Sequence, residues 1–163
     1  MTGYPKWFSE SLLAMLALLL ATGLLLVPTV LDLRLEWDFA WRLTGDQRIT
    51  VAALHVAASF VVFAFSGALW AVHIRRGWKM RLNRASGISL VSLIVLLLLS
   101  GVGIYYLGGE VSSAVASLSH TALGVAAGLC FAIHFVRGRA IKAAAQARDA
   151  AGQARAAPRS ANS

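Results

Sequence analysis

Four histidines are the residues best suited to chemistry in this chain of 163 residues. Each of them falls within an apolar run that contains no charged residue: His55, His73, His120 and His134. Ionisable side chains are costly inside a membrane and by default mark function there. A single intramembrane histidine is more often a hydrogen-bonded contact between helices. Four histidines arranged as two pairs require a common explanation.

The spacing within each pair places both histidines on one face of a helix. His55 and His73 are 18 residues apart, which is five whole turns at about 100° per residue. His120 and His134 are 14 residues apart, about 40° short of four turns. If the two helices cross the membrane in the same direction, His55 meets His120 at a first level and His73 meets His134 at a second level.

The number of ligands at each level indicates the kind of metal site. The two histidines of one helix lie about 27 Å apart in the first pair and about 21 Å apart in the second, so one metal cluster cannot bind all four. Each level offers two imidazoles and no nearby Cys, Asp or Glu to complete a zinc or copper shell. An iron porphyrin needs only two axial ligands from the protein. The ligand count therefore predicts two bis-histidine haems.

Basic residues follow the two histidines of the second level by a few positions, and we count them as candidate cofactor-binding residues: Arg75, Arg76, Arg137 and Arg139. Haem propionates attract such cations. The excess of Lys and Arg in cytoplasmic loops accounts for the same residues equally well. Both interpretations stay open. Small residues on the histidine faces, such as Ala52, Ser59, Ser117 and Gly124, leave room for a flat ring.

The elements that must position the histidines are membrane helices. The chain is 58% hydrophobic and 13% charged with a mean hydropathy of +0.70, which is too apolar for a soluble domain. Four uncharged runs have a bilayer-spanning length of roughly 20 residues: Leu12 to Leu31, Ile49 to Ile74, Ala85 to Leu107 and Val111 to Val136. The expected fold class is an all-α four-transmembrane-helix bundle. We interpret the first run as an uncleaved helix rather than a signal peptide.

The distribution of charge predicts the orientation of these helices. Residues 75–84 carry five basic side chains and no acid, and the tail after Val136 carries six basic side chains and one acid. Both segments are cytoplasmic by the positive-inside rule, so both termini are expected in the cytoplasm. The net charge of +8 does not indicate a nucleic-acid partner, because the basic residues lie between apolar runs. Contact with lipid headgroups explains it.

Two domains are expected: a four-helix transmembrane di-haem domain at 1–137 and a basic, Ala/Arg-rich cytoplasmic tail at 138–163. The tail should begin as a helix that continues the fourth span and then become disordered. The segment Leu33 to Leu43 mixes aromatic and charged residues, which suits an anchor at the headgroup level or a lid over a site. Cys130 is the only cysteine and no C-x-x-C-H motif is present, so an internal disulfide and covalent haem attachment are excluded.

The pattern resembles the four-helix membrane b-type cytochromes over about residues 12–136. These include the bacterial cytochrome b561 type, the membrane subunits of formate dehydrogenases and nickel-iron hydrogenases, and the haem-bearing core of the cytochrome b of quinol-oxidising complexes. The 14-residue spacing of His120 and His134 is similar to the paired histidines of one helix in those families. The 18-residue spacing in the second helix and the lack of a histidine in the first depart from them. The resemblance implies two non-covalent haems b, electron transfer across a bacterial inner membrane, and quinone as the lipid-side carrier.

The expected function is therefore that of an electron-transfer cytochrome b, or the membrane subunit of an oxidoreductase with a redox partner protein, with no catalytic residue of its own. Leu33 to Leu43, near the first level, is the expected position of a quinone site. One alternative is a haem-free transporter or proton relay, which normally adds Asp or Glu within its spans; the second, third and fourth runs contain none. Another alternative is a membrane anchor subunit with one haem or none.

Overall fold

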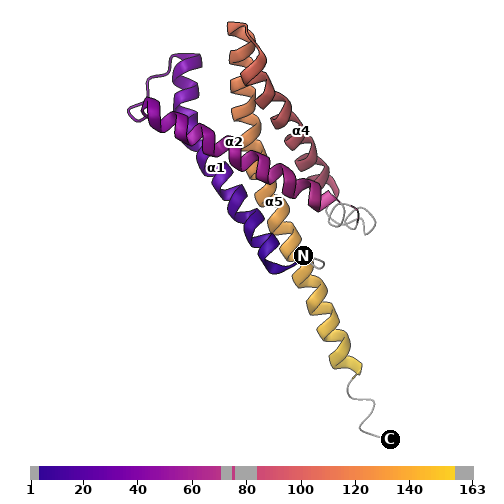
Figure 1. Ribbon diagram of the computed structural model, residues 1–163. Helices are drawn as coiled ribbons and strands as arrows, with labels where there is room; N and C mark the ends of the chain where they lie inside the picture. Colours follow the sequence, from indigo (N-terminus) through magenta and orange to yellow (C-terminus); the bar gives the residue numbers. More distant parts are fainter. Residues whose placement is uncertain (1–3, 71–74, 76–83, 157–163) are drawn as a thin grey trace, which may run out of the picture.

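The computed structural model of the chain describes residues 4–70, 75 and 84–156. Its helices are α1 (Lys6–Leu35), α2 (Gly45–Leu69), α4 (Arg84–Tyr106) and α5 (Glu110–Ala156), as Figure 1 shows. All four are long and apolar enough to cross a membrane. The expectation of an all-α protein with four helices able to span a membrane is therefore confirmed.

The helices differ from the predicted apolar runs mainly at their ends. The helix α1 begins six residues before Leu12 and ends four residues after Leu31, because polar residues at a membrane edge still form backbone hydrogen bonds along the helix. Pro28 lies inside α1, where a membrane helix tolerates the loss of one N–H donor. The helix α2 ends at Leu69, and positions 71–74 of the predicted second run lie outside the described residues.

The connection between α1 and α2 is not helical. The helix α1 ends where Glu36 takes a left-handed conformation, with φ of 55°, and its N–H donates to the carbonyl of Asp32. The Asp32 carboxylate also accepts a hydrogen bond of 2.6 Å from Arg42, which ties the connection back to α1. Trp37 and Trp41 are more than half exposed. Exposed indole rings at this position fit the expected anchor at the headgroup level.

The helices run alternately up and down. In Figure 1, α1 and α4 rise while α2 and α5 descend, so the two helices that carry the histidines run in the same direction. We call the end where α1 joins α2 and α4 joins α5 the upper end. The main packed pairs among the described helices are α4 with α5, α1 with α2, and α1 with α5. The helices α1 and α4 therefore flank the two histidine helices.

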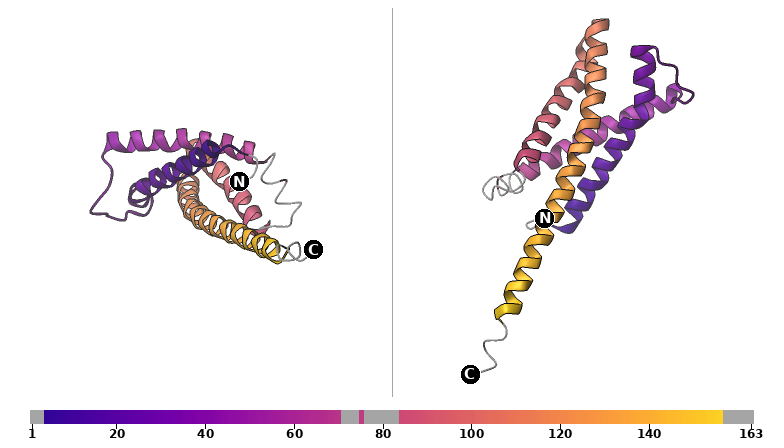
Figure 2. Two further views of the ribbon diagram at one scale, coloured as in Figure 1. Left: turned by 90° about the horizontal axis from the view of Figure 1, so that it is seen from below. Right: turned by 180° about the vertical axis from the view of Figure 1, so that it is seen from behind.

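Few side chains of this bundle are fully buried. The buried apolar residues include Phe8, Leu12, Ala58, Val62 and Ala116, whereas most large apolar side chains face outward. This distribution suits a protein that is solvated by lipid, because lipid provides no hydrophobic force between helices and small residues form the contacts. The lower half of α5 extends beyond the other helices (Figure 2). Its outer residues from 135 to 154 are exposed.

Candidate functional site

The structure brings His55 of α2 and His120 of α5 together at the first level. Their ring centroids are 6.3 Å apart and the ring planes cross at 78°. Both side chains are partly buried. The helix α2 crosses the bundle obliquely (Figure 1), and the juxtaposition of these two histidines is the one expected from the sequence positions.

Each of these imidazoles has a hydroxyl partner on a flanking helix. His55 Nδ1 lies 3.0 Å from Thr22 Oγ1 of α1, and His120 Nδ1 lies 3.0 Å from Ser100 Oγ of α4. The Thr22 hydroxyl also donates to the carbonyl of Leu18, at 2.8 Å, and the Ser100 hydroxyl donates to that of Leu97, at 3.2 Å. A hydroxyl carries a single hydrogen. This arrangement favours the imidazole Nδ1–H as the donor in both contacts.

The proton on Nδ1 decides what Nε2 can do. In a neutral imidazole one nitrogen carries the hydrogen and the other keeps a lone pair. With Nδ1 donating to Thr22 or Ser100, the lone pair is on Nε2. A histidine in this form, with its other nitrogen bound to a fixed acceptor, is the usual metal-ligating arrangement. His55 and His120 are therefore both prepared to bind a metal through Nε2.

Glycines let the flanking helices approach the two rings closely. Gly23 follows Thr22, and a Cβ at this position would lie 3.1 Å from His55 Cε1. Gly101 follows Ser100, and a Cβ there would lie 3.5 Å from His120 Cε1. The backbones of α1 and α4 thus pack directly against the imidazoles. A hydroxyl residue followed by glycine both orients each ring and leaves space for it.

The second level is described in part. His134 Nδ1 of α5 lies 3.0 Å from Ser86 Oγ of α4, and Gly87 follows Ser86. His73 lies outside the described residues. Ser86 and Ser100 are 14 residues apart, as are His120 and His134. Because α4 and α5 run in opposite directions, one alignment of the two helices places Ser100 beside His120 and Ser86 beside His134.

Sequence reasoning overlooked these supporting residues. Serine, threonine and glycine are common in membrane helices as packing residues, so Thr22, Ser86 and Ser100 do not stand out individually. The signal that could have found two of them is the repeated spacing. Two Ser-Gly dipeptides in the third apolar run are separated by the same 14 residues as the histidines of the fourth run.

Three of the four predicted arginines lie within the described part of the chain. Arg75, Arg137 and Arg139 are exposed, and none of them makes a hydrogen bond or ion pair with a described histidine. Arg139 places its guanidinium 5.8 Å from the centre of the Phe135 ring. Arg76 lies outside the described residues. Cys130 Sγ faces the carbonyl of Ser86 at 3.9 Å.

The donor set of the first level fits an iron porphyrin. Two imidazoles that bind one metal through Nε2 at about 2.0 Å have ring centroids roughly 6 Å apart, and the observed distance is 6.3 Å. Among the described residues, no three His, Cys, Asp or Glu side chains are grouped to hold a metal ion. A porphyrin supplies its own four equatorial ligands. A Cβ at Gly124, one turn below His120, would meet no atom within 4 Å, which leaves space beside the pair.

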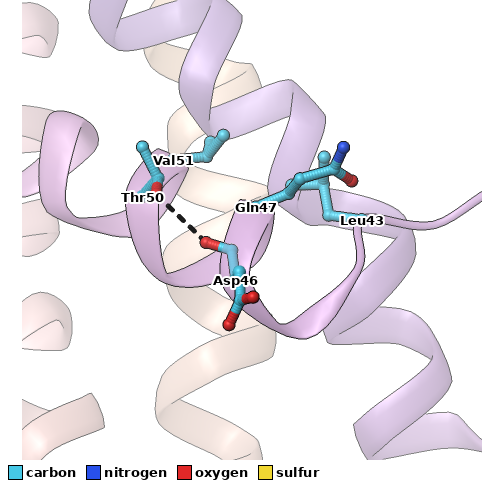
Figure 3. Close-up of a pocket in the computed structure, with 5 residues that line it drawn as sticks. All are labelled: Leu43, Asp46, Gln47, Thr50 and Val51. Carbon is cyan, nitrogen blue, oxygen red and sulfur yellow. Dashed lines mark hydrogen bonds between the residues drawn. The ribbon is translucent and has the colours of Figure 1, made fainter.

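A shallow hollow lies at the start of α2 (Figure 3). It is lined by Leu43, Asp46, Gln47, Thr50 and Val51, and the Thr50 hydroxyl donates to the Asp46 carbonyl at 3.0 Å. Leu43 is the last residue of the segment expected to carry a quinone site. The hollow combines apolar carbons with a carboxylate and an amide, and its lining residue Val51 stands one helical turn before His55 in α2.

No family model, curated protein sequence or solved structure matches this chain. The basis for assigning a function is therefore the histidine pair, with its two hydroxyl partners and two glycines.

Proposed function

We propose that the protein is a di-haem b membrane cytochrome that relays electrons across a bacterial inner membrane, between the quinone pool and a partner redox protein. The observation that carries this proposal is the pair His55 and His120, with ring centroids 6.3 Å apart. Haem b, when bound, supplies a one-electron iron couple whose filled axial positions favour electron transfer over oxygen binding. The four-helix membrane fold supports the same class of protein.

Two kinds of residue at the first level would hold haem: the histidines that bind the iron and the hydroxyl residues that orient them. His55 and His120 would bind the iron through Nε2. Thr22 and Ser100 would fix the ring orientations and raise the basicity of the ligands by accepting the Nδ1–H hydrogen bonds. The apolar helices around the pair would exclude water, which helps to set the reduction potential.

A second haem completes the proposal. His73 and His134 would form the second ligand pair, and the contact between His134 Nδ1 and Ser86 repeats the support seen at His120. We propose that Arg75, Arg76, Arg137 and Arg139 bind the propionates at this level, on the cytoplasmic side where both termini would lie. Quinone would exchange electrons near the first level, where the hollow of Figure 3 offers apolar and polar groups.

The optical spectrum of the purified full-length protein tests this function. We expect a reduced-minus-oxidised difference spectrum with b-type bands, and we expect His120→Ala to remove or convert one component of it. A haem-free transporter, a proton relay or an anchor subunit predicts a colourless protein. A preparation that stays colourless after haem supplementation during expression contradicts the proposed function.

A further inference from the structure

One cation of α1 lacks an anionic partner among the described residues at the upper end of the bundle. Arg34, in the last turn of α1 and partly buried, donates a 2.7 Å hydrogen bond to Ser113 Oγ of α5. No carboxylate of the described residues lies within 4.0 Å of its guanidinium. A partly buried guanidinium with a single hydroxyl acceptor has further N–H donors that call for acceptors.

The Arg34 guanidinium stands about two turns above the first level. Its acceptor Ser113 precedes His120 by seven residues, so it lies on the same face of α5 about 10 Å higher. The His120 ring is the one paired with His55. Because α1 packs against α5, the guanidinium lies above this histidine pair.

Local structure does not account for the position of Arg34. A basic residue in the last turn of a helix can interact with the free carbonyls there, but the Arg34 guanidinium reaches across to α5 instead. The nearby carboxylate of Asp32 is bound to Arg42. A planar guanidinium with several spare N–H donors is best matched by a carboxylate or a phosphate.

We infer that Arg34 binds a propionate carboxylate of the haem held by His55 and His120. This inference rests on the proposed function. Arg34 donates through its remaining N–H groups, so the propionates point to the upper end. Ser113 holds the guanidinium in place. The shared anion chemistry could also come from a lipid phosphate, and the experiment separates the two sources.

The test compares haem with haem dimethyl ester, in which both carboxylates are blocked. The full-length apoprotein carries His134→Ala, so that only the first level can bind. The quantity compared is the ratio of the dissociation constant of the ester to that of haem. We expect this ratio to be about ten in the Arg34 protein and near one in Arg34→Gln. The matched control is Arg48→Gln, which removes an exposed arginine near the same end that has no side-chain partner and should leave the ratio unchanged.

A second measurement keeps the test independent of the His134→Ala background. In redox titrations of the otherwise unaltered protein, Arg34→Gln should lower the midpoint potential of one haem component, because a nearby cation disfavours the more positive oxidised form. Arg48→Gln should leave the midpoint potentials of both haem components unchanged. An Arg34→Gln protein that behaves like Arg48→Gln overturns the inference.

The remaining outcomes separate this inference from the proposed function. If Arg34→Gln weakens haem and ester equally, and only in bilayers with anionic lipid, Arg34 binds a lipid phosphate and the inference is wrong. If haem binds to His55 and His120 with an unchanged ratio in Arg34→Gln, only the inference fails. A chain that binds no haem overturns both.

Discussion

At the scale of single residues, the hydroxyl behind each imidazole bears on what the first level can bind. When Thr22 and Ser100 donate their only hydroxyl hydrogen to a backbone carbonyl, they accept from the imidazoles. This arrangement favours the tautomer of His55 and His120 that keeps the lone pair on Nε2.

Removing either hydroxyl should weaken haem binding. We expect Thr22→Val and Ser100→Ala each to lower haem affinity by about 10- to 100-fold, the usual effect of losing a hydrogen bond behind a metal ligand. The midpoint potential of the same component should rise, because the ligand becomes less basic. Haem titration and redox titration measure both effects. Thr22→Ser keeps the hydroxyl and should retain the original haem affinity and midpoint potential. The control Ser89→Ala should change neither, because Ser89 is an exposed serine of α4 that bonds only its own helix.

Cys130 is expected to have no part in ligation. Ten residues separate it from His120, which places it about 80° away from the face of His120, and its thiol is directed toward the Ser86 carbonyl. We predict that Cys130→Ala leaves the haem spectrum unchanged, since the thiol serves as a small packing group. A spectrum typical of a different ligand set in this variant would contradict the assignment.

At the scale of helices, α1 and α4 carry no histidine but position the histidines of α2 and α5. Their hydroxyl-glycine dipeptides lie where each flanking helix crosses an imidazole. The antiparallel register of α4 and α5 repeats the support after 14 residues, at Ser86 and His134. Each of these histidines is therefore held by its own helix and by a second helix beside it.

The glycines provide a graded test of this support. At Gly23 an added methyl group would lie 3.1 Å from His55 Cε1, at Gly101 it would lie 3.5 Å from His120 Cε1, and at Gly67 it would meet nothing within 4 Å. We expect Gly23→Ala to lower haem affinity several-fold, because the ring must move by a few tenths of an ångström. Gly101→Ala should change it about twofold at most, since an ordinary contact costs little. Gly67→Ala is the control and should bind haem with the affinity of the unaltered protein. Equal effects on haem affinity at all three positions would show that the close approach of α1 and α4 to the imidazoles is unimportant.

At the scale of the whole molecule, the two histidine helices run in the same sense, which allows two ligand levels across one membrane. Figure 1 shows α5 descending along the bundle and α2 descending obliquely across it, with α1 and α4 running the other way. The first level lies toward the upper end and His134 lies 14 residues further down α5. Two ligand pairs spaced in this way would divide roughly 30 Å of hydrocarbon into shorter steps for an electron.

Haem stoichiometry and pairing test this arrangement. A pyridine-haemochrome assay should return two haems per chain. His55→Ala and His120→Ala should remove or convert the same spectral component, and His73→Ala and His134→Ala the other, because each variant leaves one site with a single ligand. Electron transfer across the membrane should fail in all four variants. If His55→Ala and His73→Ala abolish the same component in redox titrations, the pairing is wrong.

The sequence by itself determined the fold class, because the length of a hydrophobic run is matched to the thickness of a bilayer and backbone groups in lipid must be satisfied within a helix. The common direction predicted for the second and fourth spans also placed His55 level with His120. Only the tertiary structure decided which groups stand behind the imidazoles, since Thr22, Ser100 and Gly23 reach them from other helices. Arg34 emerged in the same way, because a lone arginine acquires meaning when packing shows which partner it has and which it lacks. Contacts between helices depend on crossing angle and register, which the periodicity of one helix does not contain.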